Sequence, residues 1–191
     1  MSRLRVGIVF GGRSGEHEVS LMSAASVIKY LPLDKYEPVL IGITRAGKWI
    51  TEGNPWERLK VGSNELGGPI PVELFASLDV VFPVLHGTFG EDGTIQGLFE
   101  MCGLPYVGAG VMASSVSMDK AIMKSVFRDQ GLPLAKDKVV MRRQWVKNPD
   151  EVCQDIADTF GFPVFVKPAN LGSSVGISKA NDETGDRKSV V

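Results

Sequence analysis

The residues best suited to binding a charged ligand lie in a loop at residues 167–174, between two short apolar runs at 164–166 and 175–177. This loop contains Lys167, Ser173 and Ser174 together with a glycine. The backbone N–H groups and serine hydroxyls of such a loop can approach phosphate oxygens closely, and a lysine adds a mobile positive charge. An ordinary flexible hairpin with a surface lysine is the alternative that this loop leaves open.

A second loop, residues 11–18, carries carboxylates where a strand is expected to lead into a helix. It lacks the G-x-G-x-x-G pattern of a dinucleotide site, and Glu16 and Glu18 would repel a pyrophosphate. A carboxylate here suits a cationic group, such as a substrate ammonium. The alternatives are that both acids complement the helix N-terminus, or that they bind a metal with His17. The metal site is disfavoured because three adjacent side chains cannot comfortably face one ion.

A third loop, residues 86–93, begins with His86 after another expected strand. A single histidine is usually a surface or hydrogen-bonded core residue. Glu91 and Asp92 are of the type that caps a following helix. Lys120, in a later expected helix, is by default a solvated lysine.

The second and third loops each lie between a predicted strand and a predicted helix. The apolar patterns predict strands at 6–10, 36–43 and 79–85, helices at 19–31, 72–77 and 94–101, a turn at 44–48 and a loop at 54–71. This alternation is typical of an α/β protein with a doubly wound parallel sheet. Ligands of such sheets lie outside the carboxyl ends of the strands, so both loops should face one crevice.

The pattern changes after residue 108. It predicts helices at 114–130 and 150–160, and strands at 138–141, 164–166 and 175–177. We therefore predict an N-terminal domain at residues 1–112, a second domain segment at 113–180, and a polar tail at 181–191 that frays in solution.

Composition excludes several classes of function. The 191 residues are 43% hydrophobic and 23% charged, as in globular proteins with a core. The formal net charge of −1 offers no electrostatic basis for binding nucleic acid or an acidic membrane. There is no leader-like segment or long apolar run, and Cys102 and Cys153 lack the spacing of a zinc site or disulfide framework. The sequence predicts a cytoplasmic protein.

Five segments together carry a more specific signal. They are GGRSGEHEVS at 11–20, HGTFGEDG at 86–93, SMDK at 117–120, VKP at 166–168 and GSSVG at 172–176. In this order they resemble the signatures of the D-alanine–D-alanine ligase family, bacterial peptidoglycan-precursor enzymes of the ATP-grasp fold. The resemblance runs from about residue 3 to about residue 180. It implies a Rossmann-like pre-ATP-grasp domain followed by the first part of an ATP-grasp α+β domain.

The resemblance implies an ATP-dependent reaction that joins two D-alanines through an acyl phosphate, with Mg²⁺ as cofactor. Glu16 matches the residue that binds the ammonium of the first D-alanine, and Val19 matches the residue beside its methyl group. Ser173 matches a serine hydrogen-bonded into the same constellation, and His86 lies on the substrate side. Glu16 and Ser173 are thus the expected catalytic residues.

For ATP, the resemblance implies that Lys120 and Lys167 contact the phosphates and that Ser174 binds phosphate. The chain covers little more than half of a family member, and the Mg²⁺ ligands are expected in the other part. We do not assign Asp182, Glu183 or Asp186 as metal ligands, because they lie in the polar tail. We expect the chain alone to be a poor or inactive catalyst.

Other readings remain open. The chain could be related to D-alanine–D-lactate ligases, or could be a non-catalytic module that binds ATP or D-alanine. A Rossmann oxidoreductase fits the alternating pattern but lacks the dinucleotide pattern. The resemblance also suggests a homodimer formed through the N-terminal region.

Overall fold

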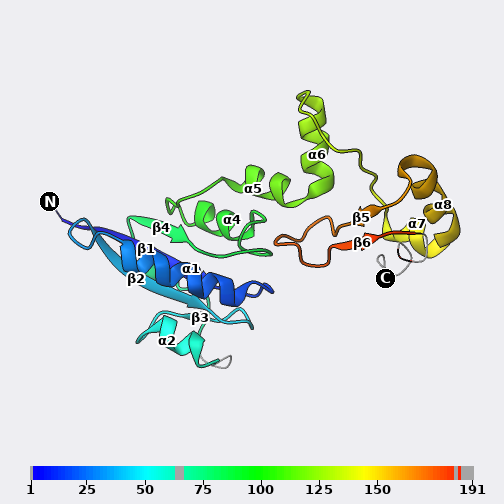
Figure 1. Cartoon of the computed structure of the whole chain (residues 1–191). Coiled ribbons are helices and arrows are strands. Elements are labelled where there is room, and N and C mark those ends of the chain that lie inside the picture. The colour runs from blue at the N-terminus through cyan, green and yellow to red at the C-terminus, as the bar shows by residue number, and fades with distance from the viewer. Residues whose placement is uncertain (1, 63–66, 183–184, 186–191) are drawn as a thin grey trace. The chain divides into compact units, whose positions relative to one another are not determined.

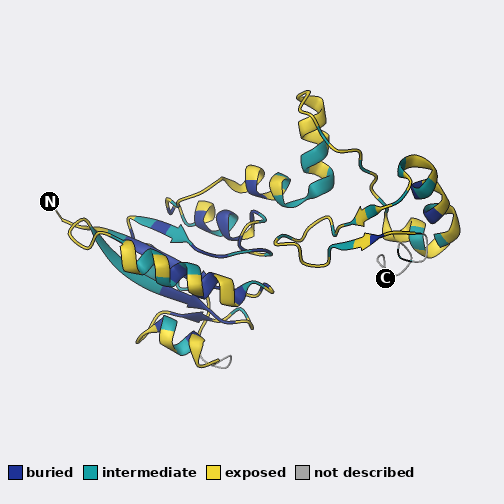
Figure 2. Cartoon of the chain, viewed as in Figure 1, coloured by how far each residue is buried: buried dark blue, intermediate teal, exposed yellow. Residues whose placement is uncertain are grey.

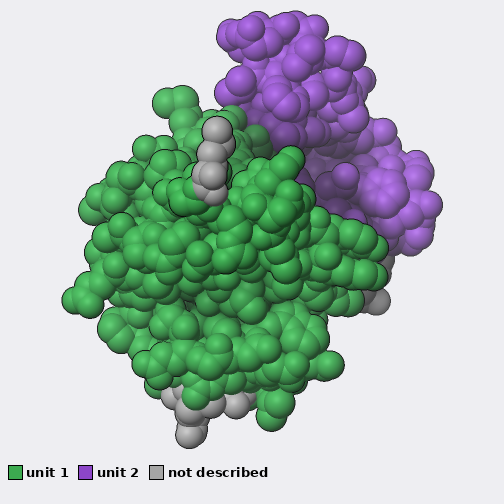
Figure 3. Space-filling model, turned by 90° about the vertical axis from the view of Figure 1, so that its left-hand side faces the viewer, with its two compact units in different colours: residues 1–117 green, residues 118–191 purple. Residues whose placement is uncertain are grey.

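The computed structural model describes residues 2–62, 67–182 and 185. The chain forms two compact units, residues 1–117 and 118–191, which are described separately below (Figure 3). The domain boundary predicted at residue 112 remains a proposal about the organisation of the chain. Within the described ranges, no helix combines the length and the apolar character needed to cross a bilayer.

Unit 1 is built on a four-stranded sheet with the strand order β3-β2-β1-β4 (Figure 1). The strands are β1 (Leu4–Gly11), β2 (Tyr36–Ile43), β3 (Trp49–Ile50) and β4 (Val80–Pro83). β1 pairs in parallel with both β2 and β4, whereas β3 pairs antiparallel with β2 at the edge. The predicted parallel sheet is confirmed, with one short antiparallel strand added after the turn at residues 44–48.

Helices cover both faces of this sheet. One face packs against α1 (His17–Tyr30) and α2 (Pro55–Lys60), and the other against α3 (Val72–Phe75) and α4 (Thr94–Met101). β1 directs Ile8 and Phe10 to the first face and Val9 to the second, and all three are fully buried. Buried and exposed residues alternate along α1, which covers the first face (Figure 2). Alternate side chains of a strand point to opposite faces, so a strand buried on both sides reads as a continuous apolar run.

Ser20 ties α1 to the ends of two strands. Its hydroxyl accepts a hydrogen bond from the Gly11 N–H at 2.8 Å and donates one to the Val84 carbonyl at 2.5 Å. The side chain is fully buried. Because buried backbone groups must be paired, this one hydroxyl fixes the start of α1 against the carboxyl ends of β1 and β4.

Two predictions for unit 1 need correction. The segment at 54–71 was predicted to be a loop, but α2 forms at Pro55–Lys60 because the Asn54 side chain accepts hydrogen bonds from the N–H groups of Trp56 and Glu57. Residues 63–66 of the predicted loop lie outside the described part of the chain. The predicted strand at 79–85 is shorter, since β4 ends at Pro83.

The described part of unit 2 includes helices α6, α7 and α8 and a two-stranded hairpin (Figure 1). They are α6 (Lys120–Asp129), α7 (Arg142–Lys147), α8 (Pro149–Phe160), β5 (Val164–Val166) and β6 (Ser178–Ala180). The predicted single helix at 114–130 is wrong, because α5 (Val111–Met118) ends before Asp119. Asp119 has extended backbone angles, and its side chain accepts hydrogen bonds from Ala121 N–H at 2.9 Å and Ile122 N–H at 3.1 Å. It therefore caps a new helix.

The strand predictions for unit 2 are confirmed only in part. β5 occupies the predicted residues, but its partner is Ser178–Ala180 rather than 175–177. Residues 138–141, which are all described, form no strand and lead into α7. The predicted helix at 150–160 is confirmed as α8, which begins one residue earlier and is capped by Asn148, whose side chain accepts a hydrogen bond from the Glu151 N–H.

We expect Ser20→Ala to lower the free energy of unfolding of unit 1 by about 2–4 kcal/mol, because two buried backbone groups lose their partner. Ser26→Ala, on the same helix, removes only an exposed bond to the Met22 carbonyl and should change stability by less than about 0.5 kcal/mol. Urea unfolding in a Trp145→Phe background, followed through the unit 1 tryptophans, measures both. Equal effects of the two substitutions would contradict the role of Ser20.

Candidate functional site

The loops that follow β1 and β4 lie side by side at the carboxyl end of the sheet. Ser14 joins them: its buried hydroxyl donates to the His86 carbonyl at 2.7 Å and accepts from the Glu16 N–H at 3.2 Å. The two loops therefore face one another, as the parallel-sheet prediction required. The Glu16 and His86 backbones are fixed by the same side chain.

The Glu16 carboxylate lies against the backbone of Gly87. A Cβ atom at position 87 would overlap the Glu16 Oε2. Gly87 also has a positive φ of 68°, so both the space and the backbone conformation favour glycine there. Although Glu16 occupies the N-cap position of α1, its side chain makes no capping hydrogen bond. Helix capping therefore does not account for the presence of a carboxylate at position 16. Glu18 instead pairs with Arg45 at 2.9 Å.

The neighbouring residues divide between the core and the surface. His17 is buried, and its Nδ1 lies 2.7 Å from the Gly12 carbonyl. Since a carbonyl only accepts, the proton resides on Nδ1. Val19 is 43% exposed in the first turn of α1. His17 and Glu18 have separate partners, and the described residues contain no cluster of three or more His, Cys, Asp or Glu side chains that could hold a metal ion.

His86 is held between two polar side chains. Its Nε2 lies 3.0 Å from the Ser23 Oγ on α1, and its Nδ1 lies 3.9 Å from the Glu91 Oε1. The other Glu91 oxygen accepts a hydrogen bond from the Gly87 N–H at 2.7 Å. His86 is therefore an oriented imidazole beside the Glu16 loop, and Glu91 braces the 86–93 loop rather than capping α4.

Asp92 closes the 86–93 loop. Its carboxylate accepts hydrogen bonds from the N–H groups of Phe89 at 2.8 Å and Thr94 at 3.0 Å. Partial burial acts to raise the pKa of Asp92, but these bonds, with one from the Thr94 side chain, outweigh it and lower the pKa from the ordinary 3.8. The hydrogen bonds of this loop therefore favour the ionised form of Asp92.

In unit 2, residues 167–177 form the loop between β5 and β6. The Val175 N–H donates to the Gly172 carbonyl at 3.0 Å, which closes a turn over Ser173 and Ser174. Both serines have positive φ angles, 49° and 61°, a conformation that costs a non-glycine residue about 1–2 kcal/mol. Both side chains are exposed. Such conformations persist where the surrounding structure imposes them, often at functional sites.

Lys120 fastens this loop to α6. Its Nζ donates to the carbonyls of Leu171 and Pro168, and its backbone N–H donates to the Ala169 carbonyl at 3.0 Å. An ammonium has three donors, so one N–H has no protein partner within the described part of the chain. Lys167 is exposed directly after β5. Unit 2 thus brings together Lys120, Lys167 and the two serines.

Three serines of unit 1 were not assigned roles from the sequence. Ser14 and Ser20 join the two loops and the helix, and Ser23 orients His86. The sequence contains one feature that could have indicated a role for Ser20. This serine lies on the apolar face of α1 with Leu21 and Ala24. A polar residue at a buried helical position requires a hydrogen-bonding partner.

Sequence comparison decides the family. The family model described as "D-ala D-ala ligase N-terminus" matches residues 5–109, and the one described as "D-ala D-ala ligase C-terminus" matches residues 126–189. The chain belongs to the D-alanine–D-alanine ligase family. The second match continues past residue 180, where the motif-based resemblance is predicted to end, into the polar tail.

Curated relatives agree with this assignment. The D-alanine–D-alanine ligase of Natranaerobius thermophilus is 46% identical over 198 residues, which cover 95% of this chain and 54% of the relative. The enzyme of the same name from Solibacter usitatus is 52% identical over 183 residues, covering 95% and 50%. The chain spans about half the length of the curated relatives it matches.

Solved structures show the same fold. The D-alanine–D-alanine ligase from Coxiella burnetii is similar with a TM-score of 0.84 at 35% identity, over 98% of this chain and 59% of that one. The VanG D-Ala:D-Ser ligase from Enterococcus faecalis gives a TM-score of 0.81 at 32% identity, over 99% and 59%. The predicted α/β fold of the ATP-grasp ligases is confirmed.

We expect Asp92→Asn to destabilise unit 1 near neutral pH and to have a smaller effect in acid. A carboxyl whose pKa is lowered by folding contributes stability above its unfolded pKa, here the ordinary 3.8, and loses it as the pH falls through the folded value. Urea unfolding of both proteins near pH 7 and near pH 3 measures the difference. An equal difference at both pH values would show that the ionised carboxylate has no such role.

Proposed function

We propose that this chain binds the first D-alanine and the ATP phosphates in an ATP-dependent ligase that joins two D-alanines into D-alanyl-D-alanine. The observation that carries the proposal is the Glu16 carboxylate, placed beside Gly87 at the carboxyl end of the sheet in a chain that belongs to this family. The Glu16 side chain makes no capping hydrogen bond, and the nearby Glu18 forms an ion pair with Arg45. A carboxylate at this place suits a substrate ammonium.

In unit 1, three residues would form the site of the first D-alanine. Glu16 would accept charge-assisted hydrogen bonds from the ammonium, which are about twice as strong as neutral ones. The exposed Val19 would pack beside the methyl group. His86, oriented by Ser23, would lie on the side of the reacting carboxylate, where the family chemistry places formation of an acyl phosphate.

In unit 2, the 167–177 loop would bind the ATP phosphates. Lys167 and the remaining N–H of Lys120 offer positive charge, and Ser174 offers a hydroxyl beside a tight turn. Ser173, in the same turn, is proposed to contact the substrate. The described residues bring together no set of metal ligands, so no step is assigned to a Mg²⁺ held by them. What they supply is charge neutralisation and positioning.

We further propose a cytoplasmic setting, because the reaction consumes ATP, and a role in supplying the dipeptide for peptidoglycan precursors. A homodimer formed through the N-terminal region is part of the same proposal. The likeness to a solved D-Ala:D-Ser ligase, at 32% identity, makes D-serine a second acceptor to test beside D-lactate.

The proposal is tested by titrating the chain with D-alanine and following its amide signals by NMR. We expect Glu16→Gln to weaken binding at least about tenfold, because the ammonium loses its counter-charge. Glu18→Gln is the matched control, since it removes the same charge two residues away, from a side chain paired with Arg45, and should change affinity less than about twofold. Equal losses, or no loss in Glu16→Gln, would contradict the proposed site.

Turnover is measured in the same proteins with ATP, Mg²⁺ and D-alanine, with or without D-lactate or D-serine, by phosphate release and product mass. D-alanine-dependent release that is lost in Glu16→Gln would support the ligase and contradict the expectation that the chain alone is a poor catalyst. Saturable binding without release would agree with that expectation. Release that is unchanged in Glu16→Gln would contradict the role of Glu16.

A further inference from the structure

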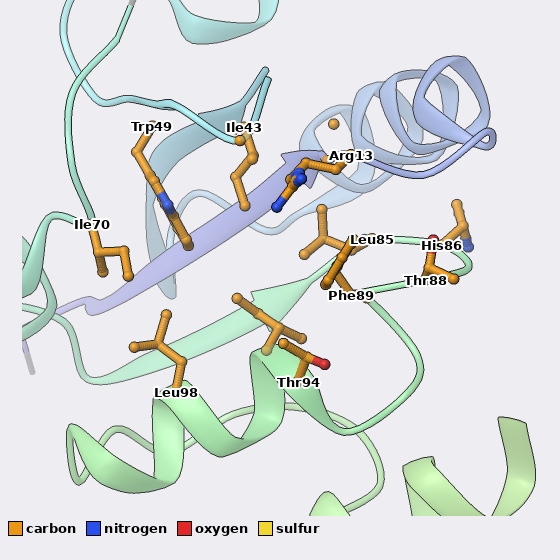
Figure 4. Close-up of a pocket in the computed structure, with 15 residues that line it drawn as sticks. Arg13, Ile43, Trp49, Ile70, Leu85, His86, Thr88, Phe89, Thr94 and Leu98 are labelled. Carbon is orange, nitrogen blue, oxygen red and sulfur yellow. The ribbon is translucent and has the colours of Figure 1, made fainter. Parts of the chain in front are cut away.

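Unit 1 contains a hollow of about 280 Å³ that shares only His86 with the site proposed for D-alanine (Figure 4). Its lining comes from the end of β1, the end of β2 with the turn into β3, the loop after β4, and α4. Its walls are mostly apolar, with Ile43, Trp49, Ile70, Leu85 and Leu98. Glu16 and Val19 are not among its lining residues, whereas His86 is.

Arg13 contributes the positive charge of this hollow. Its guanidinium carbon lies over the Phe89 ring, 4.9 Å from the ring centroid, within reach of a cation–π interaction. A Cβ at Gly47, where φ is 83°, would overlap the Arg13 side chain, so glycine makes room for the arginine. A guanidinium carries five N–H donors, so its contact with the ring leaves donors available for an anion.

The N–H edge of Arg13 has no carboxylate partner. In the ranges that the structure describes, Arg13 forms no ion pair, whereas the nearby Arg45 is neutralised by Glu18. No aspartate or glutamate lines the hollow. A cation beside apolar walls gains most from an anion that also fills the apolar space, because a carboxylate can take both N–H groups of the arginine fork.

We propose that this hollow is a binding site for a small monocarboxylate with a compact aryl or branched alkyl body. The carboxylate pairs with Arg13, and the body lies against Trp49 and Leu98. An amino acid is a poor ligand, because its ammonium would find no counter-charge here. This separates the site from the one proposed for D-alanine, and the inference goes beyond the proposed function.

The test uses benzoate as the probe and its neutral isostere benzamide as the comparison. The chain has three tryptophans, and only Trp49 lines the hollow, so the indole N–H signals of Trp56 and Trp145 are internal controls. We expect benzoate to shift the Trp49 signal saturably, and benzamide to bind at least about tenfold more weakly. D-alanine, at the same concentration, should leave Trp49 unchanged.

Charge variants give a second measurement. Arg13→Gln should weaken benzoate binding at least about tenfold, and the matched control Arg45→Gln less than about twofold. The proposal is overturned if the benzamide affinity equals that of benzoate, or if all three indoles shift together. It is also overturned if Trp49 is unmoved at about 20 mM benzoate, where a site with a Kd near 1 mM would be mostly occupied. The benzamide comparison needs no variant, so it holds even if Arg13→Gln fails to fold.

Discussion

The buried hydroxyl of Ser20 is the contact on which the geometry of unit 1 depends. It accepts from the Gly11 N–H and donates to the Val84 carbonyl, so β1, β4 and α1 converge on one atom. Polar groups at that depth are costly to leave unpaired, which makes the arrangement specific. With the strand ends fixed, Ser14 can join the two following loops through the His86 carbonyl. The Glu16 carboxylate then meets Gly87.

This arrangement divides neighbouring residues of one loop between different tasks. Glu16, His17 and Glu18 are adjacent, yet one faces the second loop, one is buried against Gly12 and one pairs with Arg45. The start of a helix spreads consecutive side chains by about 100° each, so three neighbours cannot share one ligand. Of the two acids, only Glu16 lies against the loop that carries His86. The helix therefore selects which carboxylate can meet a substrate.

Sequence patterns predicted the parts of the fold that depend on local periodicity. The predicted β2 and α4 have the observed bounds, and the loops after β1 and β4 meet because parallel strands end at one edge. The prediction for 114–130 failed because a single cap, Asp119, divides two apolar-periodic stretches. The strand at 175–177 failed because residues 173–174 adopt left-handed angles that nothing in serine favours.

The positioning contacts of the site were beyond sequence reasoning for a different reason. Ser20 reaches a carbonyl 64 residues away, and Ser23 reaches a histidine 63 residues away. Such pairings follow from the packing of the sheet and appear in no local pattern. The motifs indicated which residues could do chemistry, whereas the structure shows which side chains hold them in place.

The most direct test of this account follows the glutamate carboxyl carbons by ¹³C NMR while D-alanine is added. We expect the Glu16 signal to shift saturably as its carboxylate takes up the ammonium, and the signal of Glu18 to stay in place because Arg45 holds it. L-alanine, which presents its methyl group on the other side, should produce a weaker response. If Glu18 responds and Glu16 does not, or if both isomers act alike, the placement of the first substrate at Glu16 is wrong.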